Sequence, residues 1–213
     1  VGLVINTELT WNDHITYTVT RVNRVLWQLS RFRQLGATTE HLITFYILKI
    51  RSILMFGAVV FHSSLTADLS QKLKLQQKWS LAVILGTNYR SYSHALTVTS
   101  LPRLDTLRME ACLKWALRAQ SNPQHSHLFP LNQSEANTRW RKKYLEYKCN
   151  TTKFLKSAVP YMARVLNMHA STWQSVIRSV AMKDEDMSSS LVESTDVSFI
   201  IVLSIKIPHT GEK

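Results

Sequence analysis

Apolar side chains recur at every third or fourth position from Trp11 to Leu29, which is the period of an α-helix. The same period returns after Glu40, after Asp68 and after Leu104. The 213 residues include only 5 Gly and 5 Pro, so the residues that form the turns of a β-sheet protein are scarce. The sequence therefore predicts an all-α fold.

The first helix is the clearest predicted element. Thr10 or Asn12 can cap its start, and Gly36 stands where it should end. Its predicted inward residues are Trp11, Ile15, Val19, Val22, Leu26 and Leu29. Its predicted outward residues are Tyr17, Arg21, Arg24, Gln28 and Arg31.

Two more helices should follow. A second helix, capped by Thr38 or Thr39 and running from about 40 to 61, is so apolar that it should be buried on most sides. A third should open at Thr66 or Asp68 and stop at Gly86. Its expected inward residues are Leu69, Leu73, Trp79, Val83 and Ile84.

A short helix is expected within 88–102, and another from about 104 to 119. The core stripe predicted for the latter is Leu104, Leu107, Ala111 and Trp115. Asn122 and Pro123 then break the pattern. The opening residues 1–5 are β-branched and apolar, typical of a strand end, but they lack a partner with which to form a sheet. Residues 197–207 could form one strand in an otherwise poorly structured tail.

The charge balance favours a polyanionic partner. Lys and Arg total 26 against 14 acidic residues, a net charge of +12. The longest apolar segment, 42–65, carries Lys49 and Arg51, which favours a buried helix over a membrane span. Cys112 and Cys149 form no closely spaced pair, and no secretory signal opens the chain, so an intracellular location, nuclear or cytoplasmic, is expected.

Catalytic and metal-binding patterns are weak. Asp184, Glu185 and Asp186 cluster in a polar run that offers no apolar pocket to raise a pKa. His125 and His127 lack a third ligand nearby. We therefore expect no catalytic residue, no metal site and no cofactor in this chain.

Basic residues interleaved with aromatic ones are the chemistry that stands out, because cations neutralise phosphates and rings stack on bases. The outward arginines of the first helix form one group, and the segment 138–167, which also holds Trp140 and Tyr144, contains the other. A solvated helix face is the alternative interpretation of each. The candidate nucleic-acid contacts are Arg21, Arg24, Arg31, Arg139, Arg141, Lys142 and Lys143.

The order of short motifs resembles the region after the palm in non-LTR retrotransposon (LINE-type) reverse transcriptases. The motifs are Leu3-Val4-Ile5-Asn6, Leu9-Thr10-Trp11, His14-Ile15, His62-Ser63-Ser64-Leu65-Thr66, Ile84-Leu85-Gly86, Leu101-Pro102, Cys112-Leu113-Lys114-Trp115-Ala116, His127-Leu128-Phe129-Pro130-Leu131-Asn132 and Val159-Pro160-Tyr161. Departures occur at Ser52, Met55 and Phe61, where relatives tend to have Pro, an acidic residue and Trp.

The resemblance implies a remnant of the last palm strand at 1–8, a thumb-like helical bundle at 9–120, a linker loop at 121–137, a basic helical segment at 138–167 and an unassigned tail at 168–213. It also implies a fragment, because the family's fingers and catalytic aspartates are absent from the sequence. Magnesium is expected only with those palm carboxylates.

The function expected from this resemblance is gripping an RNA or DNA template–primer through its phosphates, without catalysis by this chain alone. The missing palm and fingers would be its protein partners, and no membrane contact is expected. Two alternatives remain open: a helical protein-interaction module with a basic surface, and a non-functional translated retroelement relic.

Overall fold

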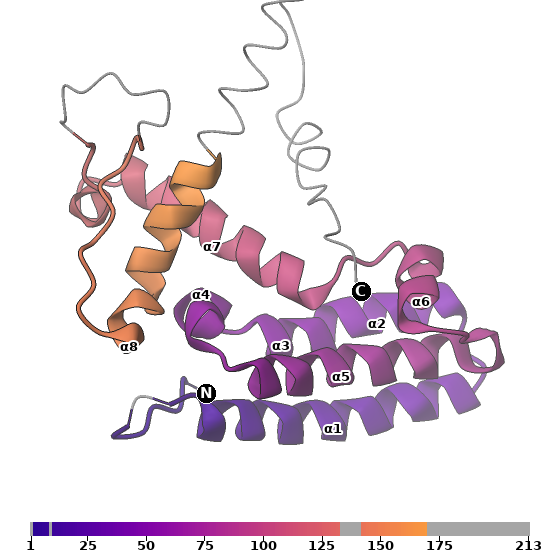
Figure 1. Ribbon diagram of the computed structural model, residues 1–213. Coiled ribbons are helices and arrows are strands. Elements are labelled where there is room, and N and C mark those ends of the chain that lie inside the picture. The colour runs from indigo at the N-terminus through magenta and orange to yellow at the C-terminus, as the bar shows by residue number, and fades with distance from the viewer. Residues whose placement is uncertain (1, 9, 133–141, 170–213) are drawn as a thin grey trace, which may run out of the picture. The chain divides into compact units, whose positions relative to one another are not determined.

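The computed structural model describes residues 2–8, 10–132 and 142–169 (Figure 1). The chain divides into two compact units, Val1–Leu166 and Asn167–Lys213. Helices form the regular structure of the described residues, and no strand occurs among them, so the all-α prediction is confirmed. The helices are α1 (Asn12–Gln34), α2 (Thr39–Phe45), the π-helix η1 (Tyr46–Arg51), α3 (Ser52–Met55), α4 (Ala58–Phe61), the 3-10 turn η2 (His62–Ser64), α5 (Ala67–Leu85), the 3-10 turn η3 (Gly86–Asn88), α6 (Tyr92–Thr99), α7 (Leu104–Ser121), the 3-10 turn η4 (Ser126–Leu128), α8 (Thr152–Leu155) and a helix over 158–169.

The main hydrophobic core lies between α1, α5 and the run from α2 to α3. Figure 1 shows α1 and α5 side by side and in the same direction, with α2 to α3 running the opposite way. Ile15, Val22 and Leu29 of α1 are fully buried, as the sequence predicts. Leu73 and Leu81 of α5 are fully buried in the same cluster. Burial of each such aliphatic side chain contributes about 1.5–3 kcal/mol.

The start of α1 differs from the prediction. Trp11 occupies the cap position, and no side chain caps the helix there. The Asn6 side chain instead accepts a hydrogen bond from the Thr10 backbone N–H at 2.8 Å and donates to Asp13 at 3.1 Å. Neither Thr10 nor Asn12 is therefore the cap, because a residue upstream orders this turn. Residues 2–6 form no regular structure and, as expected, no sheet.

The second helix exposes more apolar surface than the sequence predicts. One row of residues at intervals of four is buried, comprising Leu42, Tyr46, Ile50, Leu54 and Ala58. On other faces, Leu48 is 64% exposed and Phe56 is 45% exposed. The prediction of burial on most sides holds only in part: one face is fully buried, half-buried residues such as Ile43, Ile47 and Ile53 pack against the core beside it, and a further face is exposed. The π-helix η1 lies in the middle of this row, and its wider i to i+5 turns keep residues four apart on the same face.

A bend interrupts the same helix before α4. Phe56 is extended, and Gly57 has φ +68°, a left-handed conformation that favours glycine. An added Cβ at Gly57 would also meet the Leu3 side chain. Among the described helices, none alone is both long enough and apolar enough to cross a membrane. Thr39–Met55 and Ala58–Ser64, which are bent by 43° relative to each other, have that length and apolarity only when taken together.

Helix α5 has the predicted ends and most of the predicted inward face, since Leu69, Leu73 and Ile84 are buried and Val83 packs against the core. The Thr66 hydroxyl accepts from the Leu69 N–H at 3.3 Å, and the helix stops before Gly86. Trp79, expected inward, is 46% exposed. Gln76 and Gln77 are buried instead, so polar residues occupy part of the core face.

The hydrogen bonds of Gln77 explain why this polar side chain is buried. Its side-chain N–H donates to the Pro102 carbonyl at 2.9 Å. Its Oε1 accepts from the Tyr92 hydroxyl at 2.7 Å and from the Leu104 N–H at 3.0 Å. One buried amide therefore holds α6, the following loop and the start of α7 against α5.

Helix α7 joins the first core to a second cluster. Leu104 is buried as predicted, but the buried stripe continues through Arg108, Cys112 and Ala116. Leu107 and Ala111, predicted to be core residues, are half-buried one position from this stripe, and Trp115 is half-buried against the second cluster. The second cluster contains Cys112, Ala116, Ala119, Phe129, Tyr144, Met162, Ala163 and Leu166.

The segment expected to be helical over 138–167 is helical only in its later described part. Residues 142–150 form no helix, and Tyr144 makes an isolated antiparallel bridge with Leu131. Helix begins at Thr152, where the Thr151 hydroxyl accepts from the Phe154 N–H at 3.2 Å. The predictions for residues 170–213, including a strand at 197–207, lie outside the described residues.

Replacing Gln77 with Ala should lower the free energy of unfolding by roughly 2–4 kcal/mol, because this buried amide and its three partners, of which the Leu104 N–H is buried, lose their hydrogen bonds. Urea denaturation followed by circular dichroism measures this loss. Gln71→Ala, an exposed glutamine on the same helix, is the matched control and should change stability by less than about 0.5 kcal/mol. Equal effects of both variants would contradict the role given to Gln77.

Candidate nucleic-acid interface

The outward face of α1 carries three of the predicted contact residues. Arg24 and Arg31 are exposed and Arg21 is half-buried, as expected from the helical period. At 1.5 Å per residue, the stretch from Tyr17 to Arg31 is on the order of 20 Å long. The helix therefore presents a linear row of cations rather than a single point charge.

Aromatic rings accompany two of these arginines. The Arg21 guanidinium lies 5.7 Å from the centre of the Tyr17 ring, and the Arg31 guanidinium lies 5.9 Å from that of Trp27. Trp27 is 66% exposed. Arg31 also donates to the Gln34 side chain at 2.9 Å. These cation–π contacts hold the guanidinium groups along the helix while leaving them open to solvent.

Trp27 is a residue that the sequence analysis did not select. Trp27 follows Leu26, and a large apolar residue next to the predicted core stripe is easily interpreted as part of the core. Its position four residues before Arg31 is the signal that could have identified it, because residues four apart share a helix face.

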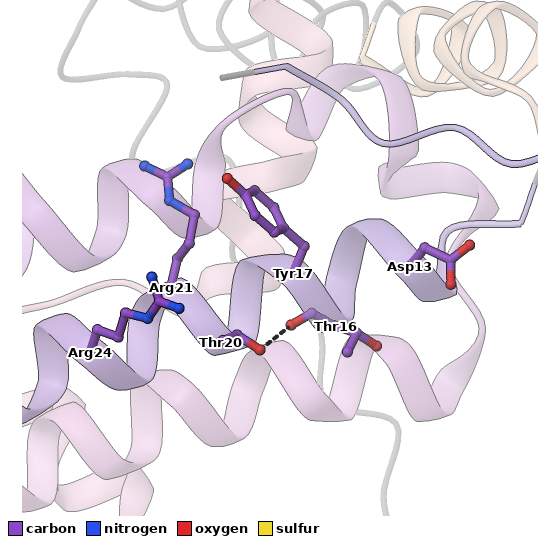
Figure 2. Close-up of a pocket in the computed structure, with 6 residues that line it drawn as sticks. All are labelled: Asp13, Thr16, Tyr17, Thr20, Arg21 and Arg24. Atoms are coloured by element: carbon purple, nitrogen blue, oxygen red, sulfur yellow. Dashed lines mark hydrogen bonds between the residues drawn. The ribbon is translucent and has the colours of Figure 1, made fainter.

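A shallow hollow of about 400 Å³ lies along the first half of this face (Figure 2). All of its lining residues belong to α1, namely Asp13, Thr16, Tyr17, Thr20, Arg21 and Arg24. Figure 2 shows the Thr20 hydroxyl bonded to the Thr16 carbonyl, a contact of 3.0 Å. Because α1 alone lines it, the hollow is an open surface suited to an extended partner, not an enclosed small-molecule site.

The charge of this face is largely uncompensated. Within the described ranges none of Arg21, Arg24 and Arg31 forms an ion pair. Asp13 is the acidic residue of the hollow, and its carboxylate accepts from Asn6 at 3.1 Å. The three guanidinium groups are therefore available to an external anion.

Arg33 lies on the same helix but has a different role. Its guanidinium donates to the Val83 carbonyl in the last turn of α5. It also covers Gly86, where an added Cβ would collide with it. Arg33 thus stabilises the C-terminal end of α5, where the helix dipole favours a cation.

The second predicted group is only partly described. Arg139 and Arg141 lie outside the described residues. The Lys142 ammonium pairs with Glu146 at 2.7 Å, and the Lys143 ammonium lies 5.4 Å from the centre of the Tyr144 ring. Lys142 is therefore partly compensated, which makes it a weaker phosphate contact than an arginine of α1.

A line of polar side chains lies away from both groups. The Arg108 Nε donates to His62 Nδ1 at 3.4 Å, and Arg108 Nη2 donates to the Ser70 hydroxyl at 3.2 Å. His62 Nε2 in turn lies 3.2 Å from the Tyr161 hydroxyl. Burial, with the nearby Arg108 charge, lowers the pKa of His62 to about 4, so this imidazole is neutral near pH 7.

Metal chemistry gains no support from the described residues, in which no three His, Cys, Asp or Glu side chains gather. His125 and His127 are exposed, and the His125 ring stacks on Trp115 at 6.3 Å. The acidic run at 184–186 lies outside the described residues.

Comparisons with protein families, with curated proteins and with solved structures find no match to this chain. The residues and contacts described above are therefore the basis for any function assigned to it.

Arg33→Ala should lower the free energy of unfolding by about 1–2 kcal/mol, because a charged hydrogen bond at the end of α5 is lost. Arg24→Ala removes the same charge from the same helix and should change stability by less than about 0.5 kcal/mol. Thermal or urea denaturation distinguishes the two. An equal loss from Arg24→Ala would mean that this face is structural.

Stability should fall as the pH is lowered from about 6.5 to about 4, because His62 takes up a proton in the unfolded chain before it does so in the folded one. After allowance for partial solvent screening we expect a loss on the order of 1–2 kcal/mol from this residue. His62→Gln should flatten the dependence, whereas the exposed His41→Gln should not. His14, whose pKa burial also lowers, leaves a residual slope.

Proposed function

We propose that this chain grips a nucleic-acid duplex through the outward face of α1, as part of a thumb-like region of a non-LTR retrotransposon reverse transcriptase. The observation that carries the proposal is the row of Arg21, Arg24 and Arg31. These residues are accompanied by Tyr17 and Trp27 and form no ion pair in the described part of the chain.

The chemistry of this face suits phosphates. A guanidinium group offers several N–H donors in a plane and binds phosphate oxygens in pairs, and α1 repeats that group from Arg21 to Arg31 along about 15 Å. Contacts of this kind position a duplex without reading its sequence. The exposed Trp27 ring could in addition stack on an unpaired base at the end of a template–primer.

The proposed role is positioning and not nucleotide transfer. The sequence contains no aromatic-Ala-Asp-Asp motif of the kind that holds the two metal ions in the parent family. Magnesium and the reacting groups would belong to the palm. The net charge of +12 supports attraction to the duplex over longer range.

A protein-interaction module is the second candidate, and the exposed apolar residues favour it. Leu35 at the end of α1 is 79% exposed, Trp27 is 66% exposed and Leu48 is 64% exposed. Large apolar side chains that remain open to solvent are typical of protein contacts when they adjoin one another. A palm domain could be such a partner, in which case both candidates hold together. A translated relic with neither activity is the third.

The test is the affinity of the chain for a labelled RNA–DNA hybrid across a salt series, measured by fluorescence anisotropy. The variant R21Q/R24Q/R31Q should weaken binding and reduce the log–log salt slope by roughly 0.9 per lost contact, the value for duplex DNA. The wild-type chain should bind hybrids of different sequence equally well.

The matched control is K78Q/K114Q/R118Q, which removes three exposed charges from α5 and α7. Both variants carry a net charge of +9, since three charges are taken from +12. If both variants weaken hybrid binding equally, the effect is due to net charge alone, and the assignment of binding to α1 is overturned. No binding at low salt by a folded chain would favour the protein module or the relic.

A further inference from the structure

Arg108 is a buried cation in the middle of α7. Its side chain is 1% exposed. Nε and Nη2 donate to His62 and Ser70, whereas Nη1 is buried without a hydrogen-bond partner among the described residues. A buried charged group of this kind ordinarily has a counter-charge and a full set of hydrogen bonds.

The groups that hydrogen-bond to Arg108 are neutral. Ser70 carries no charge, and the imidazole of His62 is neutral near pH 7 because burial lowers its pKa to about 4. Asp105 is the acidic side chain nearby, but its two oxygens accept from Arg103 at 3.1 and 2.8 Å, and one of them also accepts from the Thr106 N–H at 2.9 Å. Within the described ranges no carboxylate forms an ion pair with Arg108.

A cleft of about 260 Å³ lies above this guanidinium, between α5, α6 and the start of α7. Its polar lining consists of Ser70, Gln71, Lys74, Arg103, Asp105 and Arg108. Three cations and one carboxylate thus line the cleft, and Arg103 and Asp105 among them form an ion pair. The Lys74 ammonium lies 5.5 Å from the centre of the Tyr92 ring, which forms another part of the wall.

The size and the position of the cleft also favour a small anion. Its volume is below the range of about 300–1,000 Å³ that is usual for drug-sized ligands. The first residues of the 18-residue helix α7 line it, so the positive end of that helix lies beside the cleft, although the Leu104 and Thr106 N–H groups already donate to Gln77 and Asp105.

We propose that this cleft binds one phosphate group, with Arg108 at its floor, Lys74 and Arg103 at its mouth and the Ser70 hydroxyl as a further donor. The phosphate balances the charge of Arg108. Asp105 repels the anion but holds Arg103 at the rim through its two hydrogen bonds. This site is separate from the α1 face and does not rest on the function proposed for that face. The phosphate can belong to a nucleic-acid strand or to free phosphate or a mononucleotide.

The experiment is a titration of the full chain with inorganic phosphate at constant ionic strength, followed by NMR of the arginine Nε–H signals. The Arg108 signal should shift saturably, and K74Q and R103Q should each weaken the affinity about tenfold. K78Q, an exposed lysine on the same helix outside the cleft, should leave it within about twofold. An Arg108 signal that does not respond in a folded chain, or equal affinity in all variants, would overturn the site.

Binding of the RNA–DNA hybrid then distinguishes the two sources of phosphate. If K74Q and R103Q weaken hybrid binding as well, the cleft holds a strand phosphate. If hybrid binding is unchanged while the phosphate response is lost, the ligand is free phosphate or a mononucleotide. The R21Q/R24Q/R31Q variant should retain the Arg108 response, so failure of the α1 proposal and failure of the cleft proposal give different results.

Discussion

The packing of α1 against α5 is the interaction on which both candidate surfaces depend. Ile15, Val22 and Leu29 fix the rotation of α1 by lying in the core, and this rotation places Arg21 and Arg24 on the solvent side. On α5, the Gln77 amide holds the start of α7, the helix that carries Arg108. A weakened α1–α5 contact would therefore disturb two surfaces that share no residue.

Local signals explain how much of this fold the sequence predicts. The ends of α5 follow from the Thr66 cap and from Gly86, because each acts within a few residues of its own position. The buried polar residues could not be found in this way. His62 lies 46 positions from Arg108, and Gln77 lies 27 positions from Leu104, so their partners are known only once the helices are packed. From the sequence alone, a polar residue with no partner close to it along the chain is predicted to be exposed.

The same reasoning separates the two groups of predicted contacts. The placement of Arg21, Arg24 and Arg31 follows from helical period alone, which is why the sequence predicts it well. Lys142 pairs with Glu146 four residues later, the spacing of an ion pair on a helix, although the segment between them is not a helix. Counting charges along α1 would group Arg33 with Arg31, two residues earlier. Its guanidinium instead donates to the Val83 carbonyl at the end of α5.

The π-helix η1 has a consequence for how this chain tolerates changes in length. A turn closed by i to i+5 hydrogen bonds holds one residue more than an α-helical turn. Loss of one residue between Tyr46 and Arg51 can thus be absorbed by a return to α-helical bonding, with Leu42 and Leu54 still facing the core. An inserted residue cannot be accommodated in this way and would rotate all residues downstream, including α4, by about 100° about the helix axis. The helix is thereby more tolerant of deletion than of insertion at its centre.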